Sequence, residues 1–375
     1  MDERLQRTAA ATKTAGADWA ILTSFDSVCY GTGHVAPIEA GASPFAGGPT
    51  AAFIGADGTC GLVAANVDAT VAKTSWADPI FIYEGFAFDR PVDVVANYEQ
   101  AVRTMQMRLA LGGAVAVEPA TFTDRLAELI KSVRTVDLTE PLRRVRATKT
   151  DHERVLMKRA AQAAAVGQQT FRKATRIGRT ELEIFSEIRT AIENFAGERV
   201  AIAGDFLSGR ARTAGFTGWP IDRTIEMGDP LISDLAPRVA GYWGDSCASA
   251  VLGEPSAAYR KAFDAVMGGL LLAIEMMRPG LKIAVLDAVL RDYIGRAGYA
   301  YPHHSGHSLG TSVHEWPRLV PYEQAILQEG MFLMIEPGAY DDEIGGVRIE
   351  WMIEVTADGC RPVEPFDQIP NIASS

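Results

Sequence analysis

Two carboxylates in one short, otherwise apolar stretch constrain the fold of this chain more than any other feature. Residues 228–253 read GDPLISDLAPRVAGYWGDSCASAVLG, in which two strand-like runs flank a turn. A hairpin that turns around residues 239–240 would place Asp234 opposite Asp245, with Cβ atoms about 4.5–5.5 Å apart. Val-Ala is a poor two-residue turn, so a wider, bulged loop stays open. Even with a wider loop, the odd separation of Asp234 and Asp245 favours side chains on the same face of the hairpin.

Acidic residues on apolar strands recur near the C-terminal end. MFLMIEPGAY (331–340) predicts a strand that ends at Glu336, and GVRIEWMIEV (346–355) predicts a strand that contains Glu350. Side chains alternate between the two faces of a strand, so Arg348 and Glu350 are expected on the same face.

Four carboxylates on short hydrophobic strands require a shared cation, because facing like charges destabilise a sheet. For any single acid, a solvated position on an exposed sheet face is the simpler interpretation. For all four together, with a histidine between the two hairpins, that interpretation is weak. Oxygen-rich coordination with one imidazole suits divalent Mn, Fe, Co or Zn, and two ions are expected.

The histidines are concentrated in one segment. Residues 303–315 read HHSGHSLGTSVHE and hold four of the six histidines of the chain. A zinc-protease HExxH motif is excluded, because no histidine follows His314-Glu315 at the required spacing.

Length and charge limit the class of protein. A chain of 375 residues is long for one hydrophobic core, which predicts two domains. The formal net charge of -11 argues against a nucleic-acid partner, because a phosphate-binding surface needs an excess of Lys and Arg.

The cysteines and the N-terminal residues predict a cytoplasmic protein. The four cysteines are far apart and form no CxxC pair, so neither a disulfide framework nor a thiolate zinc site is expected. The first residues, MDERLQRTAA, lack the apolar segment of a secretory signal. No apolar stretch is long enough to cross a bilayer as a helix, so no membrane association is expected.

Residues 1–145 are predicted to form a smaller α/β domain. The segment 31–49, rich in Gly, Pro and Ala, predicts a long loop. Apolar runs predict strands at 19–25, 51–58, 79–85 and 114–119, and apolar positions at helical spacing predict helices within 91–111 and 122–133.

Residues 146–375 are predicted to form a second domain. Capping boxes, with Thr at the N-cap and Glu three residues later, predict helices that begin after Thr150 and Thr180. Residues 176–197 resemble residues 277–298, and each copy follows another helical stretch. Chance similarity of two amphipathic helices is one explanation. The other is two related α/β halves whose sheets form a cleft.

At these residues the chain resembles the metallopeptidase family of methionine aminopeptidase, aminopeptidase P and prolidase, whose pita-bread fold creatinase shares. The resemblance covers essentially the whole chain. It implies the smaller N-terminal α/β domain of the creatinase and prolidase branch. It also implies a C-terminal pita-bread α+β domain with a pseudo-twofold repeat.

The resemblance implies a dinuclear metal centre with two divalent ions, of which Mn is the expected metal and Co, Zn or Fe are alternatives. Five residues occupy the ligand positions of the family in the same order. These are Asp234, Asp245, His307 in GHSLG, Glu336 in IEPG and Glu350 in VRIE.

The same resemblance implies catalytic and substrate-binding roles. Glu336 would be both a ligand and the proton shuttle, and His314 would contact the reacting carbonyl of the substrate. Arg348 would pair with a carboxylate of the site or of the substrate, or form a plain cross-strand ion pair. His303 and His304 match no family position and are expected to line the cleft or lie at the surface.

Two departures from the family pattern concern the substrate. Prolidase-like members carry a substrate-contacting histidine seventeen positions before the first Asp ligand, where this chain has Thr217. A threonine can exchange hydrogen bonds with a substrate but carries no proton at neutral pH. Cys247-Ala248-Ser249 replace the usual Thr-Arg-Thr.

Three functions follow from these observations. The leading hypothesis is a metal-dependent hydrolase of the Xaa-Pro dipeptidase or aminopeptidase P type, acting on small peptides as a homodimer. The alternative is a creatinase- or ectoine-hydrolase-like enzyme that cleaves a non-peptide C–N bond in a small nitrogen-containing substrate. A binding module without enzymatic activity ranks last, because such relatives generally lose their ligands.

Overall fold

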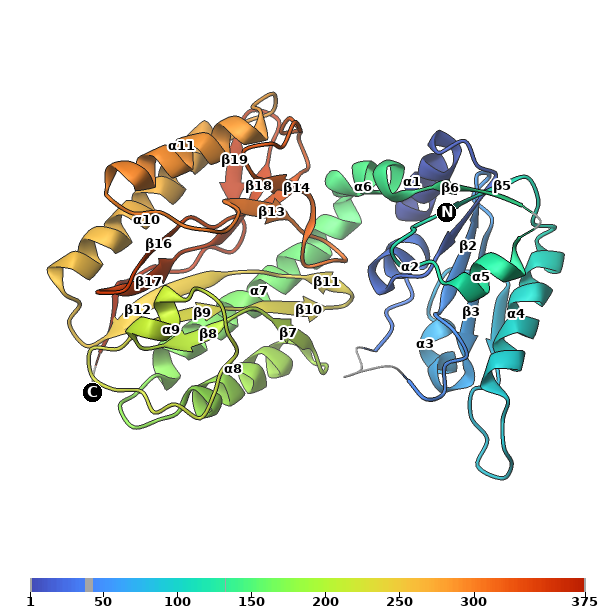
Figure 1. Ribbon diagram of the computed structural model, residues 1–375, viewed down its shortest axis with the longest axis horizontal. Coiled ribbons are helices and arrows are strands. Elements are labelled where there is room, and N and C mark those ends of the chain that lie inside the picture. The colour runs from blue at the N-terminus through green and yellow to red at the C-terminus, as the bar shows by residue number, and fades with distance from the viewer. Residues whose placement is uncertain (1, 38–42, 132, 374–375) are drawn as a thin grey trace. The chain divides into compact units, whose positions relative to one another are not determined.

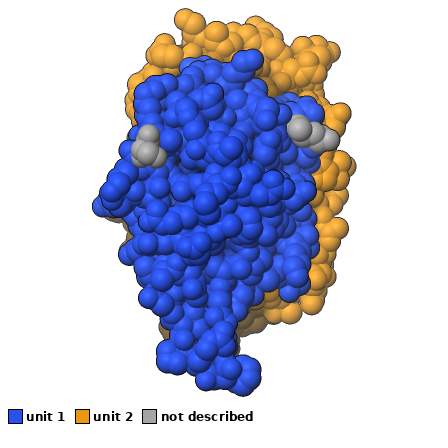
Figure 2. Space-filling view, turned by 90° about the vertical axis from the view of Figure 1, so that its right-hand side faces the viewer, with its two compact units in different colours: residues 1–146 blue, residues 147–375 orange. Residues whose placement is uncertain are grey.

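The chain divides into two compact units, residues 1–146 and residues 147–375, which Figure 2 colours separately. The structure is a computed structural model that describes residues 2–37, 43–131 and 133–373.

Unit 1 is an α/β domain built on one mixed sheet of strand order β4-β3-β2-β1-β5-β6. Strand β1 pairs in parallel with β5 and antiparallel with β2. The strands are β1 (Trp19–Leu22), β2 (Ala51–Gly55), β3 (Cys60–Ala65), β4 (Ile80–Tyr83), β5 (Ala114–Val117) and β6 (Arg134–Asp137). The helices are α1 (Glu3–Thr14), α2 (Phe25–Thr32), α3 (Ala69–Ala72), α4 (Val94–Arg108), α5 (Asp124–Leu129) and α6 (Thr139–Ala147), with a 3₁₀ turn η1 (Asn66–Asp68).

The predicted strands and helices of unit 1 are present, and the structure adds elements that the apolar runs did not indicate. Strand β3 is fully buried and shows no alternation, which hides it in a short sequence of small residues. Residues 31–32 end α2 instead of starting the predicted loop, and residues 38–42 of that loop lie outside the described residues.

Unit 2 contains two helix pairs and several short sheets. Its helices are α7 (Asp151–Ala174), α8 (Glu181–Ala196), α9 (Arg210–Ala214), α10 (Ala257–Met276) and α11 (Ile283–Arg296). Its first strands are β7 (Ala201–Ala203), β8 (Phe206–Ser208), β9 (Pro230–Asp234), β10 (Ala236–Val239), β11 (Tyr242–Trp243) and β12 (Cys247–Leu252). The later strands are β13 (Gly306–Ser308), β14 (Glu315–Leu319), β15 (Phe332–Ile335), β16 (Gly338–Asp341), β17 (Gly345–Arg348), β18 (Trp351–Val355), β19 (Cys360–Pro362) and β20 (Asn371–Ile372).

The two halves of unit 2 repeat one arrangement, a helix pair packed on a sheet (Figure 1). Helices α7 and α8 pack together and contact strands of the first half, and α10 and α11 do the same in the second half. The sheets are β20-β12-β9-β8 and β14-β13-β15-β18-β19, with smaller sheets β11-β10-β7 and β16-β17. Both predicted capping boxes are formed, by Thr150 with Glu153 and by Thr180 with Glu183.

The hairpin that carries Asp234 and Asp245 differs in register from the prediction. Asp234 lies opposite Cys247, not Asp245. The turn centres on Ala240 and Gly241, whose φ angles of 49° and 85° are both positive. A tight hairpin turn needs this combination, and glycine adopts it without steric cost, so the turn forms one residue later than predicted. Asp245 is therefore the diagonal neighbour of Asp234 on the same face.

The predicted strand 346–355 is divided into two strands in different sheets. Strand β17 pairs with β16, and β18 pairs with β15. At the junction, the backbones of Glu350 and Cys247 exchange hydrogen bonds, with N–O distances of 3.0 and 3.4 Å. This bridge joins the two halves of unit 2 beside Glu350.

No helix among the described residues is long and apolar enough to cross a membrane.

Candidate metal centre

His307 is held in the middle of a sheet. It lies in β13, between β14 and β15, and pairs with Met334 of β15. The preceding Gly306 is needed there, because a Cβ at this position would lie 1.9 Å from the Met334 carbonyl oxygen. Glu336 follows β15 directly, and its backbone N–H donates to the Ser305 carbonyl. Local sheet pairing thus places His307 and Glu336 side by side.

Three buried side chains from segments far apart in the sequence converge on one point. Asp245, His307 and Glu350 each offer one ligand atom, and these atoms lie within 4.8 Å of one another. The Nε2 atom of His307 is 3.6 Å from Asp245 Oδ2 and 3.6 Å from Glu336 Oε1. Neighbouring ligand atoms of one ion with bonds of about 2.1 Å are expected about 3.0–3.4 Å apart. The spacing therefore fits a divalent cation after a small adjustment of the side chains.

Carboxylate oxygens that lack hydrogen-bond partners also fit a divalent cation at this point. Glu336 Oε1 and Glu350 Oε2 are buried, and neither accepts a well-aligned hydrogen bond from any residue that the structure describes. A buried carboxylate oxygen without a partner is costly. A cation at this point would satisfy both atoms, and the donor set suits a transition-metal ion.

Asp234 contacts the site through Arg348. The Nη2 atom of Arg348 donates to Oδ2 of Asp234 and to Oδ2 of Asp205, both at 2.7 Å. Arg348 is only 4% exposed, so it pairs with carboxylates of the chain, which was one of the predicted alternatives. The Thr217 hydroxyl donates to Asp205 Oδ1 at 3.0 Å. Thr217 is thus linked to Asp234 through Asp205 and Arg348.

Burial and mutual repulsion disfavour the ionised form of three carboxylates. Burial raises the pKa of Asp245 and of Glu350 well above the usual carboxyl range, and the neighbouring acids raise both further. Burial also raises the pKa of Asp234 to about 7, although Arg348 opposes this shift. Such a cluster binds protons or a cation at neutral pH.

Glu336 differs from the other carboxylates because it lies among imidazoles. Burial acts to raise the pKa of Glu336, but His304, His307 and His303 lower it to about 2. Burial lowers the pKa of His307 to about 3, so its ring is neutral at neutral pH and available as a ligand.

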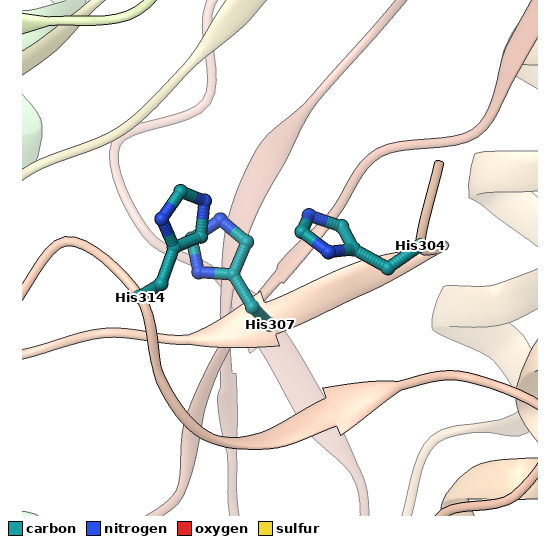
Figure 3. Close-up of side chains that lie close together, drawn as sticks. All are labelled: His304, His307 and His314. Atoms are coloured by element: carbon teal, nitrogen blue, oxygen red, sulfur yellow. The ribbon is translucent and has the colours of Figure 1, made fainter. Parts of the chain in front are cut away.

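The segment with four histidines contributes three rings to one region (Figure 3). The ring centroids of His307 and His314 are 4.2 Å apart, and His304 lies 5.3 Å from His307 and 5.6 Å from His314. His304 had no assigned role in the sequence pattern, and only the concentration of histidines indicated it. No comparable signal pointed to Asp205.

Chelation of metal is expected to destabilise the protein more at pH 8 than at pH 5.5. The pKa of Asp234 rises from 3.8 to about 7 on folding, so the stability linked to its protonated form is present below about pH 4 and is lost as the pH rises through about 7. A bound cation replaces the proton on Asp234, so the metal-loaded protein does not lose this stability as the pH rises. Glu336, with a pKa of about 2, does not titrate in this window.

The measurement is the melting temperature with and without chelator at the two pH values. The metal-loaded protein is the internal control for every titrating group outside the site. An equal effect of chelator at pH 5.5 and pH 8 would contradict this prediction.

Comparison with known proteins decides the family. The family model described as metallopeptidase family M24 matches residues 155–357, more than half of the chain. The chain belongs to metallopeptidase family M24. A model described as the creatinase/prolidase N-terminal domain matches residues 4–148. The predicted family and the prediction of a metal-dependent hydrolase are confirmed, and membership of M24 implies divalent metal ions as cofactors.

Individual proteins that are similar in sequence to this chain carry dipeptidase names. A putative dipeptidase, YkvY of Bacillus subtilis strain 168, is 34% identical over 251 residues, which cover 65% of this chain and 69% of the relative. A Xaa-Pro dipeptidase of Pyrococcus horikoshii is 29% identical over 275 residues, which cover 72% of this chain and 77% of the relative.

Solved structures of similar proteins confirm the predicted fold class, a smaller N-terminal α/β domain followed by a pita-bread domain. The Xaa-Pro dipeptidase from Bacillus anthracis is 24% identical and covers 99% of both chains with a TM-score of 0.82. The dipeptidase PepE from Mycobacterium ulcerans is 26% identical and covers 99% of this chain and 97% of that chain with a TM-score of 0.80.

Proposed function

We propose that this M24 hydrolase is an Xaa-Pro dipeptidase with a dinuclear metal centre. The observation that carries the proposal is the convergence of Asp245, His307 and Glu350 to within 4.8 Å, bordered by Glu336. The dipeptidase names of several relatives favour a dipeptide substrate.

The proposed ligands of the two ions are Asp234, Asp245, His307, Glu336 and Glu350. Mn is the first metal to test, and Co, Zn and Fe follow, because carboxylate and imidazole donors suit all four. Arg348 would favour the ionised form of Asp234 and orient its carboxylate by donating to the Oδ2 atom.

The proposed chemistry is hydrolysis of an amide bond. When bound, divalent ions would lower the pKa of a water molecule and polarise the carbonyl of the substrate. Glu336, ionised at neutral pH, would accept the proton of the water and deliver it to the leaving nitrogen. Burial lowers the pKa of His314, so its neutral ring would donate an N–H to the oxygen of the reacting carbonyl.

Hydrolysis of Xaa-Pro dipeptides by the Mn- or Co-loaded protein is the expected result. The assay compares Ala-Pro and Leu-Pro with the reversed dipeptides Pro-Ala and Pro-Leu, with proline-headed tripeptides and with small linear and cyclic amidines. If every proline peptide stays intact while an amidine is opened, the enzyme belongs with the creatinase- or ectoine-hydrolase-like alternative. The amidines are included because this chain has Thr217 where prolidase-like members have a substrate-contacting histidine.

The assembly and location are further parts of the proposal. A homodimer is expected from the resemblance to the prolidase branch, and light scattering should then give twice the chain mass of 40.4 kDa. A cytoplasmic location is favoured by Cys60, Cys247 and Cys360, which form no disulfide. A monomer in solution would contradict the proposed homodimer.

A further inference from the structure

His304 lies at the metal centre although it belongs to none of the five ligand positions. Its ligand atom lies within 4.8 Å of those of His307 and His314. Figure 3 shows the His304 ring turned toward the other two, from the segment that precedes β13. Three imidazoles in one partly buried region are unusual in a chain with six histidines.

The contact between His304 and Glu336 is close but is not a well-formed hydrogen bond. The Nε2 atom of His304 is 3.0 Å from Glu336 Oε1. That oxygen nevertheless accepts no well-aligned hydrogen bond from any described residue. Neighbouring ligand atoms of one ion with bonds of about 2.1 Å also lie about 3.0 Å apart, so this spacing suits a shared ion.

His303, the neighbouring histidine, is in a different situation. Its Nδ1 lies 2.8 Å from the His304 carbonyl oxygen, which can only accept, so Nδ1 carries the proton. Its Nε2 then accepts from the Tyr340 hydroxyl at 2.8 Å. Both ring nitrogens of His303 are occupied, whereas Nε2 of His304 contacts Glu336 and the His304 ring lies beside those of His307 and His314.

The tautomer of His307 leaves one nitrogen of its ring available to an ion. His307 Nδ1 donates to the Ser308 carbonyl at 2.9 Å, so only Nε2 has a free lone pair. One nitrogen binds one ion. The group of Asp245, His307 and Glu350 and the group of His304, His307 and His314 both contain His307. The two groups therefore meet at His307, and His304 Nε2 reaches the same region through its contact of 3.0 Å with Glu336 Oε1.

The backbone around His304 is fixed by helix α11. The Arg291 guanidinium donates to the carbonyls of Tyr301 and His303, at 3.1 and 2.7 Å. The Ser305 hydroxyl donates to the buried Asp287 carboxylate. The residues on both sides of His304 are thus held in place, which preorganises its ring at the site.

We propose that His304 is a further metal ligand, which supplies a second imidazole to the ion held by His307 and Glu336. The inference rests on the proposed dinuclear centre and adds a nitrogen ligand to it. Imidazole favours Zn, Co and Ni over Mn. A site with His304 as a second imidazole should therefore prefer Zn, Co and Ni more strongly than a site whose only nitrogen ligand is His307.

The test is metal binding to protein stripped of metal, measured by competition with a chromophoric chelator for Zn, Co and Mn separately. The variant His304→Gln is expected to lose at least about 10–100-fold in Zn and Co affinity, the loss seen when even an outer partner of a ligand is removed. Mn affinity should change much less. The visible absorption of the Co-loaded protein should change in shape and intensity, because a nitrogen ligand is lost.

His152→Gln is the matched control, because it removes an exposed imidazole on helix α7. It should bind all three metals as the unchanged protein does. The His304 side chain is 20% exposed, so the fold should tolerate its loss, and His304→Ala provides a second variant.

Unchanged Zn and Co affinities and an unchanged Co spectrum in both His304 variants would show that His304 only hydrogen-bonds to Glu336. That outcome overturns this inference and leaves the proposed function intact. Failure of the unchanged protein to bind any divalent ion would instead overturn the proposed function and this inference together.

Discussion

Replacing Asp245 with alanine is expected to abolish metal binding at the centre and to lower kcat/KM on the order of 10⁴-fold. Asp245 is buried, and its carboxylate is one of three ligand atoms that lie within 4.8 Å. Its loss leaves His307 and Glu350 without the charge that balances a cation. The measurements are bound metal per chain and the initial rate on an Xaa-Pro dipeptide.

Two further variants make this result specific. Asp245→Asn keeps the shape of the side chain and removes only the charge, so it should lose metal as well. Asp222→Asn changes an exposed carboxylate outside the cluster and should leave both measurements unchanged. Turnover at the original rate in either Asp245 variant would refute a role for Asp245 in metal binding.

Replacing Arg348 with methionine is expected to lower the free energy of unfolding by about 3–5 kcal/mol. The Arg348 side chain is 5% exposed and donates to Asp205, to Asp234 and to the Phe216 carbonyl. Methionine has a similar length but cannot donate, so it would leave two largely buried carboxylates without their shared cation. Calorimetry of the metal-free protein measures the loss and can resolve separate transitions of the two units.

Arg361→Met is the matched control for this prediction. Arg361 also pairs with a carboxylate, Glu354 Oε2, at 2.7 Å, but its side chain is 67% exposed. Glu354 is buried but keeps a second cation, Arg154, at 3.2 Å, and the guanidinium of Arg361 stays in solvent, so the control should shift stability by no more than about 1 kcal/mol. An equal loss of unfolding free energy in the two variants would mean that the burial of Arg348 does not increase its contribution to stability.

The proposed ligand residues were accessible from the sequence because the family resemblance names them and because the acidic ones stand out on short apolar strands. Asp234 and Asp245 are separated by an odd number of positions, which keeps them on one face for hairpin loops of two or four residues. Glu336 directly follows an apolar strand, which identified it in the sequence, and in the structure it lies opposite Ser305 and diagonal to His307. The capping boxes at Thr150 and Thr180 are also local, and both formed as predicted.

The register of the hairpin was not accessible in the same way. It depends on which residues accept positive φ, and Ala240 shares the turn with Gly241 although alanine rarely adopts that conformation. The division of the strand 346–355 was hidden for a related reason. Its alternating pattern continues through the junction at Glu350, where the chain changes sheets.

The sequence by itself determined the two-part α/β organisation, the family and the types of side chain that meet at the centre. Apolar periodicity and short motifs encode these features within a few residues. Only the tertiary structure decided that Arg348 joins Asp205 to Asp234, and that the His304 ring turns toward Glu336. These contacts join segments up to 143 residues apart, and their geometry depends on how helices and sheets pack, which no local pattern specifies.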